Sequence, residues 1–165
     1  MVNPIVNRRD IMAGIAALSL TSSLARAEEF VDLNWSDLVS DGQAPSFSFT
    51  QNHDDAISTA QPPSLGVRTD WNDQTVRLPG FIVPLDYSGT GVTTFMLVPF
   101  VGACVHVPPP PANQLVFVTT KDPYQSSGLF EAVRVIGKFG TSSTSNHLAD
   151  VAYSLAADKI IPFKL

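Results

Sequence analysis

The chain contains a single cysteine in 165 residues, and this scarcity excludes several classes of protein. One thiol cannot form a disulfide framework within the chain, nor supply the two or four cysteines of the common structural zinc modules. Basic residues are also scarce, with 10 Lys and Arg against 15 Asp and Glu and a net charge of −5. Nucleic-acid binding needs clustered basic side chains to neutralise phosphates, so we expect no nucleic-acid partner.

Charged residues of either sign make up only 15% of the chain, below the roughly 25% that is usual in soluble domains. Hydrophobic residues make up 44%. Intrinsic disorder goes with low hydrophobicity and high charge, so this composition favours a folded chain. At this length we expect one globular domain.

The first 27 residues have the pattern of a cleavable signal peptide. Arg8 and Arg9 precede an uncharged run over residues 11–25, and an Ala-x-Ala site ends at Ala27. The apolar run is shorter than the roughly 20 residues that span a bilayer. The paired arginines resemble a twin-arginine export signal, although general secretion is also open. We expect cleavage after Ala27 and a periplasmic protein with no membrane span after cleavage.

The remaining chain divides near residue 75 into two parts of different texture. Residues 28–74 are polar and loop-rich, with one short helical turn expected near Trp35 and Leu38. Residues 75–165 contain short β-rich runs, each closed by Gly, Pro or Asp. These runs are Val76–Leu85, Thr93–Phe100, Leu115–Thr120, Phe130–Phe139 and Val151–Ala156. They predict a mainly β fold, an OB-like five-stranded barrel with an irregular N-terminal segment, with a small β-sandwich as the alternative. We expect Gly80, Gly102 and Gly137 to mark bulges or bends.

Cys104 and His106 form the pair that is best suited to carry chemistry. In an extended segment their side chains point to the same face, with Cα atoms roughly 6.5 to 7 Å apart. A thiolate and an imidazole at that separation can converge on one tetrahedral Zn²⁺. Ligation would also protect a lone thiol in an oxidising compartment. Met96 is a soft thioether, so Cu⁺ is the alternative ion.

Two ligands do not complete a metal site. His147 lies in a polar stretch, and His53 stands beside Asp54 and Asp55, so these residues are the candidates for a third ligand. Met96 is a further possible ligand. A site shared across a dimer, or one completed by a partner, stays open at this point.

The same segment supports two other interpretations. Four prolines, Pro108–Pro111, favour a rigid polyproline II arm that, with Asn113 and Gln114, would shape a partner-binding surface around an inert Cys104. A thiol enzyme with Cys104 as nucleophile is less favoured, because no orienting residue or oxyanion hole stands out.

The central block resembles a known family. The stretches 80–86, 95–99 and 102–114, with an upstream Trp35-x-x-Leu38 element, are similar to the exported bacterial domain-of-unknown-function family 3299. The resemblance is strongest from Leu78 to Val118. Genes of that family tend to lie beside transport components linked to zinc, so the resemblance implies a partner in metal transport. Our leading hypothesis is therefore a periplasmic, non-enzymatic accessory protein of transition-metal handling, with zinc as the favoured ion.

Overall fold

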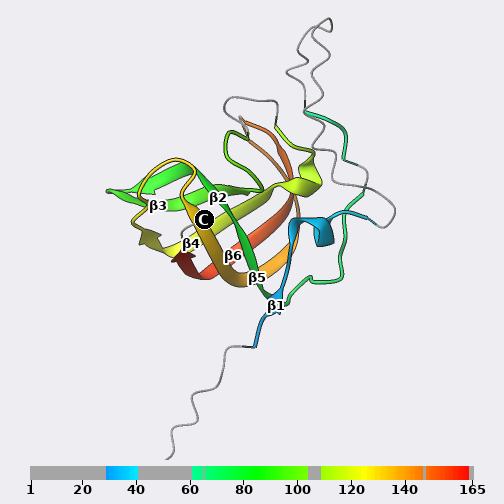
Figure 1. Cartoon of the computed structure of the whole chain (residues 1–165), viewed down its shortest axis with the longest axis horizontal. Coiled ribbons are helices and arrows are strands. Elements are labelled where there is room, and N and C mark those ends of the chain that lie inside the picture. The colour runs from blue at the N-terminus through cyan, green and yellow to red at the C-terminus, as the bar shows by residue number, and fades with distance from the viewer. Residues whose placement is uncertain (1–28, 41–60, 65, 104–108, 147, 164–165) are drawn as a thin grey trace, which may run out of the picture.

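The computed structural model describes residues 29–40, 61–64, 66–103, 109–146 and 148–163. Five strands close into a barrel and a sixth, short strand lies beside it (Figure 1). The barrel strands are β2 (Thr75–Ser88), β3 (Gly91–Val98), β4 (Val116–Tyr124), β5 (Ala132–Ser145) and β6 (Asp150–Pro162), and the extra strand is β1 (Val31–Asp32). The predicted five-stranded, OB-like barrel is confirmed, and its closed ring excludes the β-sandwich alternative.

The ring closes because β2 changes partner along its length. Its first half, from Thr75 to Phe81, pairs with β5, and its second half, from Phe81 to Ser88, pairs with β3. The strand order is β2-β3-β4-β6-β5, and β5 returns to β2. β4 and β6 are parallel, whereas the other barrel pairs are antiparallel. Gly80 precedes the switch, where a Cβ would lie 2.7 Å from Leu97 Cγ.

Helix is nearly absent from the described part of the chain, as the sequence predicts. Two short 3-10 helices occur there, η1 (Trp35–Leu38) and η2 (Ala112–Gln114). The expected turn near Trp35 and Leu38 is therefore present. Neither helix has the length and apolar character that crossing a bilayer would require.

Strands β2, β3 and β4 bury apolar side chains on both of their faces. One face fills the barrel core, as with Leu78, Phe95 and Val118, which are fully buried. The alternate residues form a second group outside the barrel, which we call the outer cluster. Its buried members are Val83, Met96, Val98, Ala103, Leu115, Ala149 and Val151. Because strand side chains alternate between faces, a strand that is buried on both sides reads as a nearly continuous apolar run.

The described part of residues 28–74 is irregular apart from β1 and η1. β1 pairs in parallel with β2, and Arg77 Nη2 donates to Asp32 Oδ2 at 2.7 Å. The indole Nε1 of Trp35 donates to the Pro79 carbonyl at 2.8 Å. These contacts fasten the N-terminal segment to β2.

Candidate functional site

The predicted site residues divide into two groups. Cys104, His106, Pro108, His53 and His147 lie outside the residues that the structure describes. The structure describes the other predicted site residues, which are Met96, Pro109–Pro111, Asn113 and Gln114. Within the described ranges, no three His, Cys, Asp or Glu side chains lie close enough together to hold a metal ion. Cys104 and the three histidines lie outside those ranges, so the metal site stays a prediction.

Asn113 and Gln114 lie at the end of the proline run and are buried. Their exposed fractions are 4% and 1%. The Asn113 side chain donates to the Gly66 carbonyl at 3.0 Å, and Gln114 Nε2 donates to the Trp35 carbonyl at 3.0 Å. Both side chains therefore hold the chain's own N-terminal segment on the barrel. Their predicted share in a partner surface stays a prediction.

The Gln114 amide has a fixed orientation. Its nitrogen donates to two carbonyls, those of Trp35 and Asn113, so the two ends of the amide cannot exchange places without losing both bonds. Its Oε1 is buried and accepts no hydrogen bond from any described residue. An unpaired buried acceptor costs about 1–3 kcal/mol, so a donor outside the described residues or a water would stabilise this position.

Tyr153 and Gln61 complete the attachment of the N-terminal segment. The Tyr153 hydroxyl donates to the Leu38 carbonyl at 2.8 Å and accepts from the Arg68 backbone N–H at 2.8 Å. Burial raises the pKa of this hydroxyl above its ordinary value. The Gln61 side chain bonds both backbone groups of Asp150, at 2.9 and 2.8 Å. Neither residue was predicted as a site residue, and the place of Tyr153 within the β-rich run Val151–Ala156 was the one available sequence signal.

The proline arm packs against the protein in its described part. Pro110 is buried, whereas Pro109 and Pro111 are half-buried. The Pro110 carbonyl accepts a hydrogen bond from Gln61 Nε2 at 2.8 Å. Of the three described prolines, Pro109 and Pro111 are the ones with accessible surface, and the predicted role of the arm in partner binding stays a prediction.

Met96 lies at the centre of the outer cluster and is fully buried. Its Sδ accepts a hydrogen bond from Asn146 Nδ2 at 3.5 Å. Asn146 also holds the turn that follows it, because its Oδ1 accepts from the Leu148 and Ala149 N–H groups. The segment on both sides of position 147 is thereby fixed against the outer cluster.

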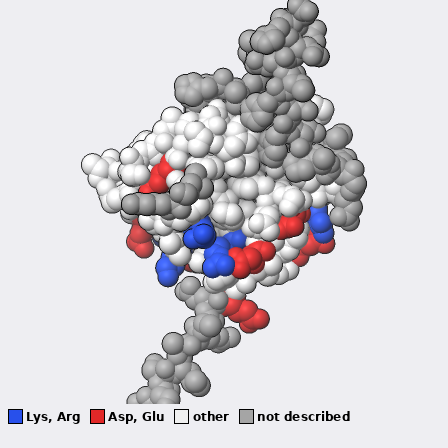
Figure 2. Space-filling view, viewed as in Figure 1, with Lys and Arg blue, Asp and Glu red and all other residues white. Residues whose placement is uncertain are grey.

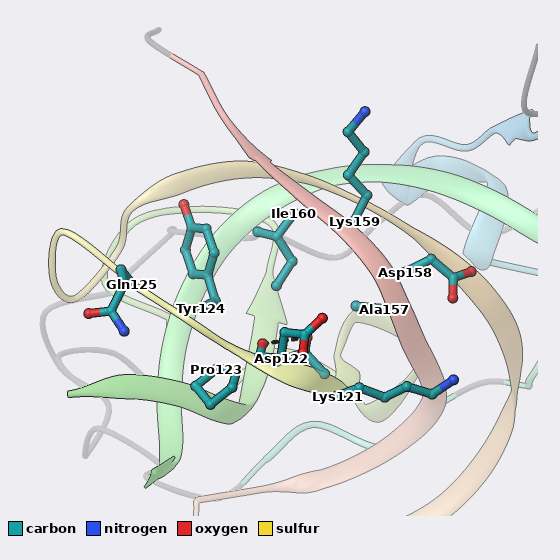
Figure 3. A pocket seen from close by; sticks show the side chains of 10 residues that line it. Lys121, Asp122, Pro123, Tyr124, Gln125, Ala157, Asp158, Lys159 and Ile160 are labelled. Atoms are coloured by element: carbon teal, nitrogen blue, oxygen red, sulfur yellow. Dashed lines mark hydrogen bonds between the residues drawn. The ribbon is translucent and has the colours of Figure 1, made fainter. Parts of the chain in front are cut away.

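A second region of interest is a cavity of about 480 Å³ between β4 and β6, shown in Figure 3. Its wall includes Tyr124, whose hydroxyl donates to Glu131 Oε1 at 3.0 Å. The other oxygen of Glu131 accepts from the Ser126 hydroxyl and the Ser127 N–H. This network fixes the loop between β4 and β5.

Tyr124 should ionise at unusually high pH. Burial, followed by the hydrogen bond to Glu131, raises the pKa of Tyr124 from 10.0 to about 12. The folded chain holds this proton more firmly than the unfolded chain does. The resulting stability is present below pH 10 and is lost as the pH rises towards 12. In a rapid pH jump followed by tyrosinate absorbance, we expect Tyr124→Phe to remove a step near pH 12. If Tyr124→Phe instead removes a step near pH 10, Tyr124 ionises at its ordinary pKa and the expected effect of burial is wrong.

Comparison with known proteins identifies related sequences without an assigned activity. The family model described as "protein of unknown function (DUF3299)" matches residues 28–162. The crystal structure of a DUF3299 family protein from Pseudomonas aeruginosa PAO1 is similar to this chain at 34% identity and a TM-score of 0.69. The match covers 83% of this chain and 98% of that one. No curated protein matches the chain.

Proposed function

The chain belongs to the DUF3299 family, and we propose that it is a periplasmic, non-enzymatic accessory protein of transition-metal handling. Zinc is the favoured ion, and a metal-linked transport system is the proposed partner. Cys104 and His106 are the proposed ligands, with His147 as the favoured third.

The convergence of two chain segments on the outer cluster carries this proposal. Cys104 directly follows Ala103, which is fully buried in the outer cluster. His147 directly precedes Leu148, which packs against the same cluster. Because consecutive Cα atoms are about 3.8 Å apart, each candidate ligand is one residue away in the chain from a residue of the outer cluster. This convergence favours His147 over His53 as the third ligand.

The chemistry of these side chains suits a closed soft-metal site. Tetrahedral Zn²⁺ accepts a thiolate and imidazoles together. An apolar surrounding controls the access of water to a metal site, and the outer cluster with its buried Met96 is the proposed surrounding here. The Met96 sulfur already accepts a hydrogen bond, so we assign it to this apolar surrounding rather than to the ligands.

The position of the outer cluster on the barrel also supports a binding role. OB barrels bind ligands on the outer face of their second and third strands and on the loops beside it. In this chain those strands are β3, which carries Met96 and Val98 of the outer cluster, and β4, which Leu115 of the same cluster directly precedes. Docking of a partner through the proline arm Pro108–Pro111, without any metal, is the alternative.

Zinc titration of the purified chain tests the proposal. We expect the wild type to bind Zn²⁺ more tightly than about 10 μM, equivalent to roughly −7 kcal/mol. Cys104→Ser and His147→Ala should each weaken binding at least about tenfold, because each removes one of very few ligands. His53→Ala is the matched control and should bind like the wild type. Equal binding by the wild type and Cys104→Ser, or no binding, would refute the metal site and leave the docking alternative.

A further inference from the structure

The barrel wall has an opening between two of its strands. The parallel ladder of β4 and β6 ends at the pair Thr120 and Ala157. β4 nevertheless continues to Tyr124, and β6 continues to Pro162. The cavity of about 480 Å³ lies between these two continuations, and its lining residues all come from them and the adjoining Gln125.

Both strands bulge where they separate. β3 pairs with β4 at Thr119 and next at Tyr124, so residues 120–123 have no partner in β3. β5 pairs with β6 at Ala157 and next at Lys159, which leaves Asp158 as an extra residue. Bulges end strand pairing, redirect side chains and are common beside binding sites. Two of them face one cavity here.

Among the residues that the structure describes, none pairs with the edge of β6 that faces the cavity. From Lys159 to Pro162 this strand pairs with β5 on one side only, and its described ladder with β4 has already ended. On the other wall, Lys121, Asp122 and Pro123 belong to neither described ladder of β4. The Asp122 carbonyl already accepts from the Thr120 hydroxyl at 2.9 Å, and Pro123 has no N–H, so β6 is the edge that is left for backbone pairing. An open strand edge presents N–H and C=O groups that an extended peptide can pair with.

Charges of both signs surround this opening. β4 contributes Lys121 and Asp122, and β6 contributes Asp158 and Lys159, all of them exposed. Among the described residues, no ion pair joins any of these four side chains. In Figure 3 the Lys121, Asp158 and Lys159 side chains extend away from the part of the wall where Ile160 and the Tyr124 ring lie. Figure 2 shows that, in the view of Figure 1, most of the visible Lys, Arg, Asp and Glu lie in the lower half of the described surface.

We propose that this opening binds a short extended peptide with free termini, which adds as a strand between β4 and β6. The open edge of β6 pairs with the peptide backbone, and the peptide lies in the depression between β4 and β6. The unpaired lysines complement the terminal carboxylate, and the unpaired aspartates complement the terminal ammonium group. Ala157 and Ile160 supply an apolar surface for the peptide side chains.

Amide chemical shifts of the ¹⁵N-labelled full chain, titrated with the tripeptide Val-Thr-Val, test this proposal. We expect shifts confined to residues 120–125 and 157–160, with saturation below about 10 mM. The same peptide with N-methylated amides keeps its side chains but loses its backbone donors, so it should bind at least about tenfold more weakly. Acetylated and amidated Val-Thr-Val lacks both terminal charges and should bind more weakly than the free peptide.

A matched pair of variants separates the aspartate at the opening from general charge effects. Asp158→Asn should weaken binding of the free tripeptide at least about threefold and leave binding of the capped peptide unchanged. Only the free peptide carries an ammonium group that the carboxylate can attract. Asp86→Asn, an exposed carboxylate on β2, should change neither. Absence of shifts, equal binding of the N-methylated peptide, or shifts centred elsewhere would overturn the proposal. Concentration-dependent shifts of the same amides without peptide would assign the opening to a second copy of the chain.

Discussion

Gly137→Ala should destabilise the barrel by about 3 kcal/mol, because the added methyl group meets backbone rather than a flexible side chain. A Cβ at Gly137 would lie 2.1 Å from the Ala156 carbonyl oxygen and 2.8 Å from Ala157 Cα. Those atoms belong to β6, and β6 is paired with β5 at this level. Relief of the contact requires the two strands to separate. At about 2–4 °C per kcal/mol, the melting temperature should fall by about 6–12 °C.

Gly140→Ala supplies the control in the same strand. A Cβ at Gly140 meets only Ser154 Oγ, at 3.7 Å, which is ordinary contact. The same substitution there should change the free energy of unfolding by less than about 1 kcal/mol, in either direction. Thermal unfolding followed by circular dichroism measures both variants. Equal melting temperatures of Gly137→Ala and Gly140→Ala would contradict the prediction, because β6 would then have moved away from the added methyl group at little cost.

Tyr153→Phe should release the N-terminal segment from the barrel at a cost of about 2 kcal/mol. The substitution keeps the ring, which packs 5.2 Å from the Phe139 ring between centroids. It removes the hydroxyl that donates to the Leu38 carbonyl and accepts from the Arg68 N–H. The Leu38 carbonyl belongs to a fully buried residue, so its lost partner is not readily replaced by water.

Hydrogen exchange distinguishes local release from general instability. The Arg68 amide should exchange about 30-fold faster in Tyr153→Phe, whereas core amides of β3 should change less. Tyr87→Phe is the control, because Tyr87 is 60% exposed and its ring stays at the surface. Uniform acceleration across β3 and the N-terminal segment would contradict a local clamp.

The sequence predicted the barrel strands well where apolar residues mark them, and less well at their ends. The predicted run Phe130–Phe139 stops where polar residues begin, yet β5 continues to Ser145. Those polar residues are strand because they pair with the start of β6, as in Thr144 with Val151. Pairing over long distances in the chain decides such ends, and local composition does not register it.

The roles of Asn113 and Gln114 were the least predictable part of the site. Their position after four prolines suggested a surface that faces a partner. Their hydrogen-bond partners are the Gly66 and Trp35 carbonyls, which lie 47 and 79 residues away in the chain. A backbone carbonyl has no sequence signature, so no pattern could have connected these residues. The Tyr153 bond to Leu38 spans 115 residues and was missed for the same reason.

The partner change along β2 also affects how fast the chain can fold. β2 forms a hairpin with β3 next to it in sequence, but its other half must wait for β5, which brings Thr75 opposite Lys138. Contacts between distant residues slow folding, and β-barrels that depend on them typically fold in milliseconds to seconds. Until β5 arrives, the first half of β2 and the inward face of the hairpin stay exposed to other chains. The hairpin of β2 and β3 is therefore the part of a newly made chain that most needs protection from aggregation.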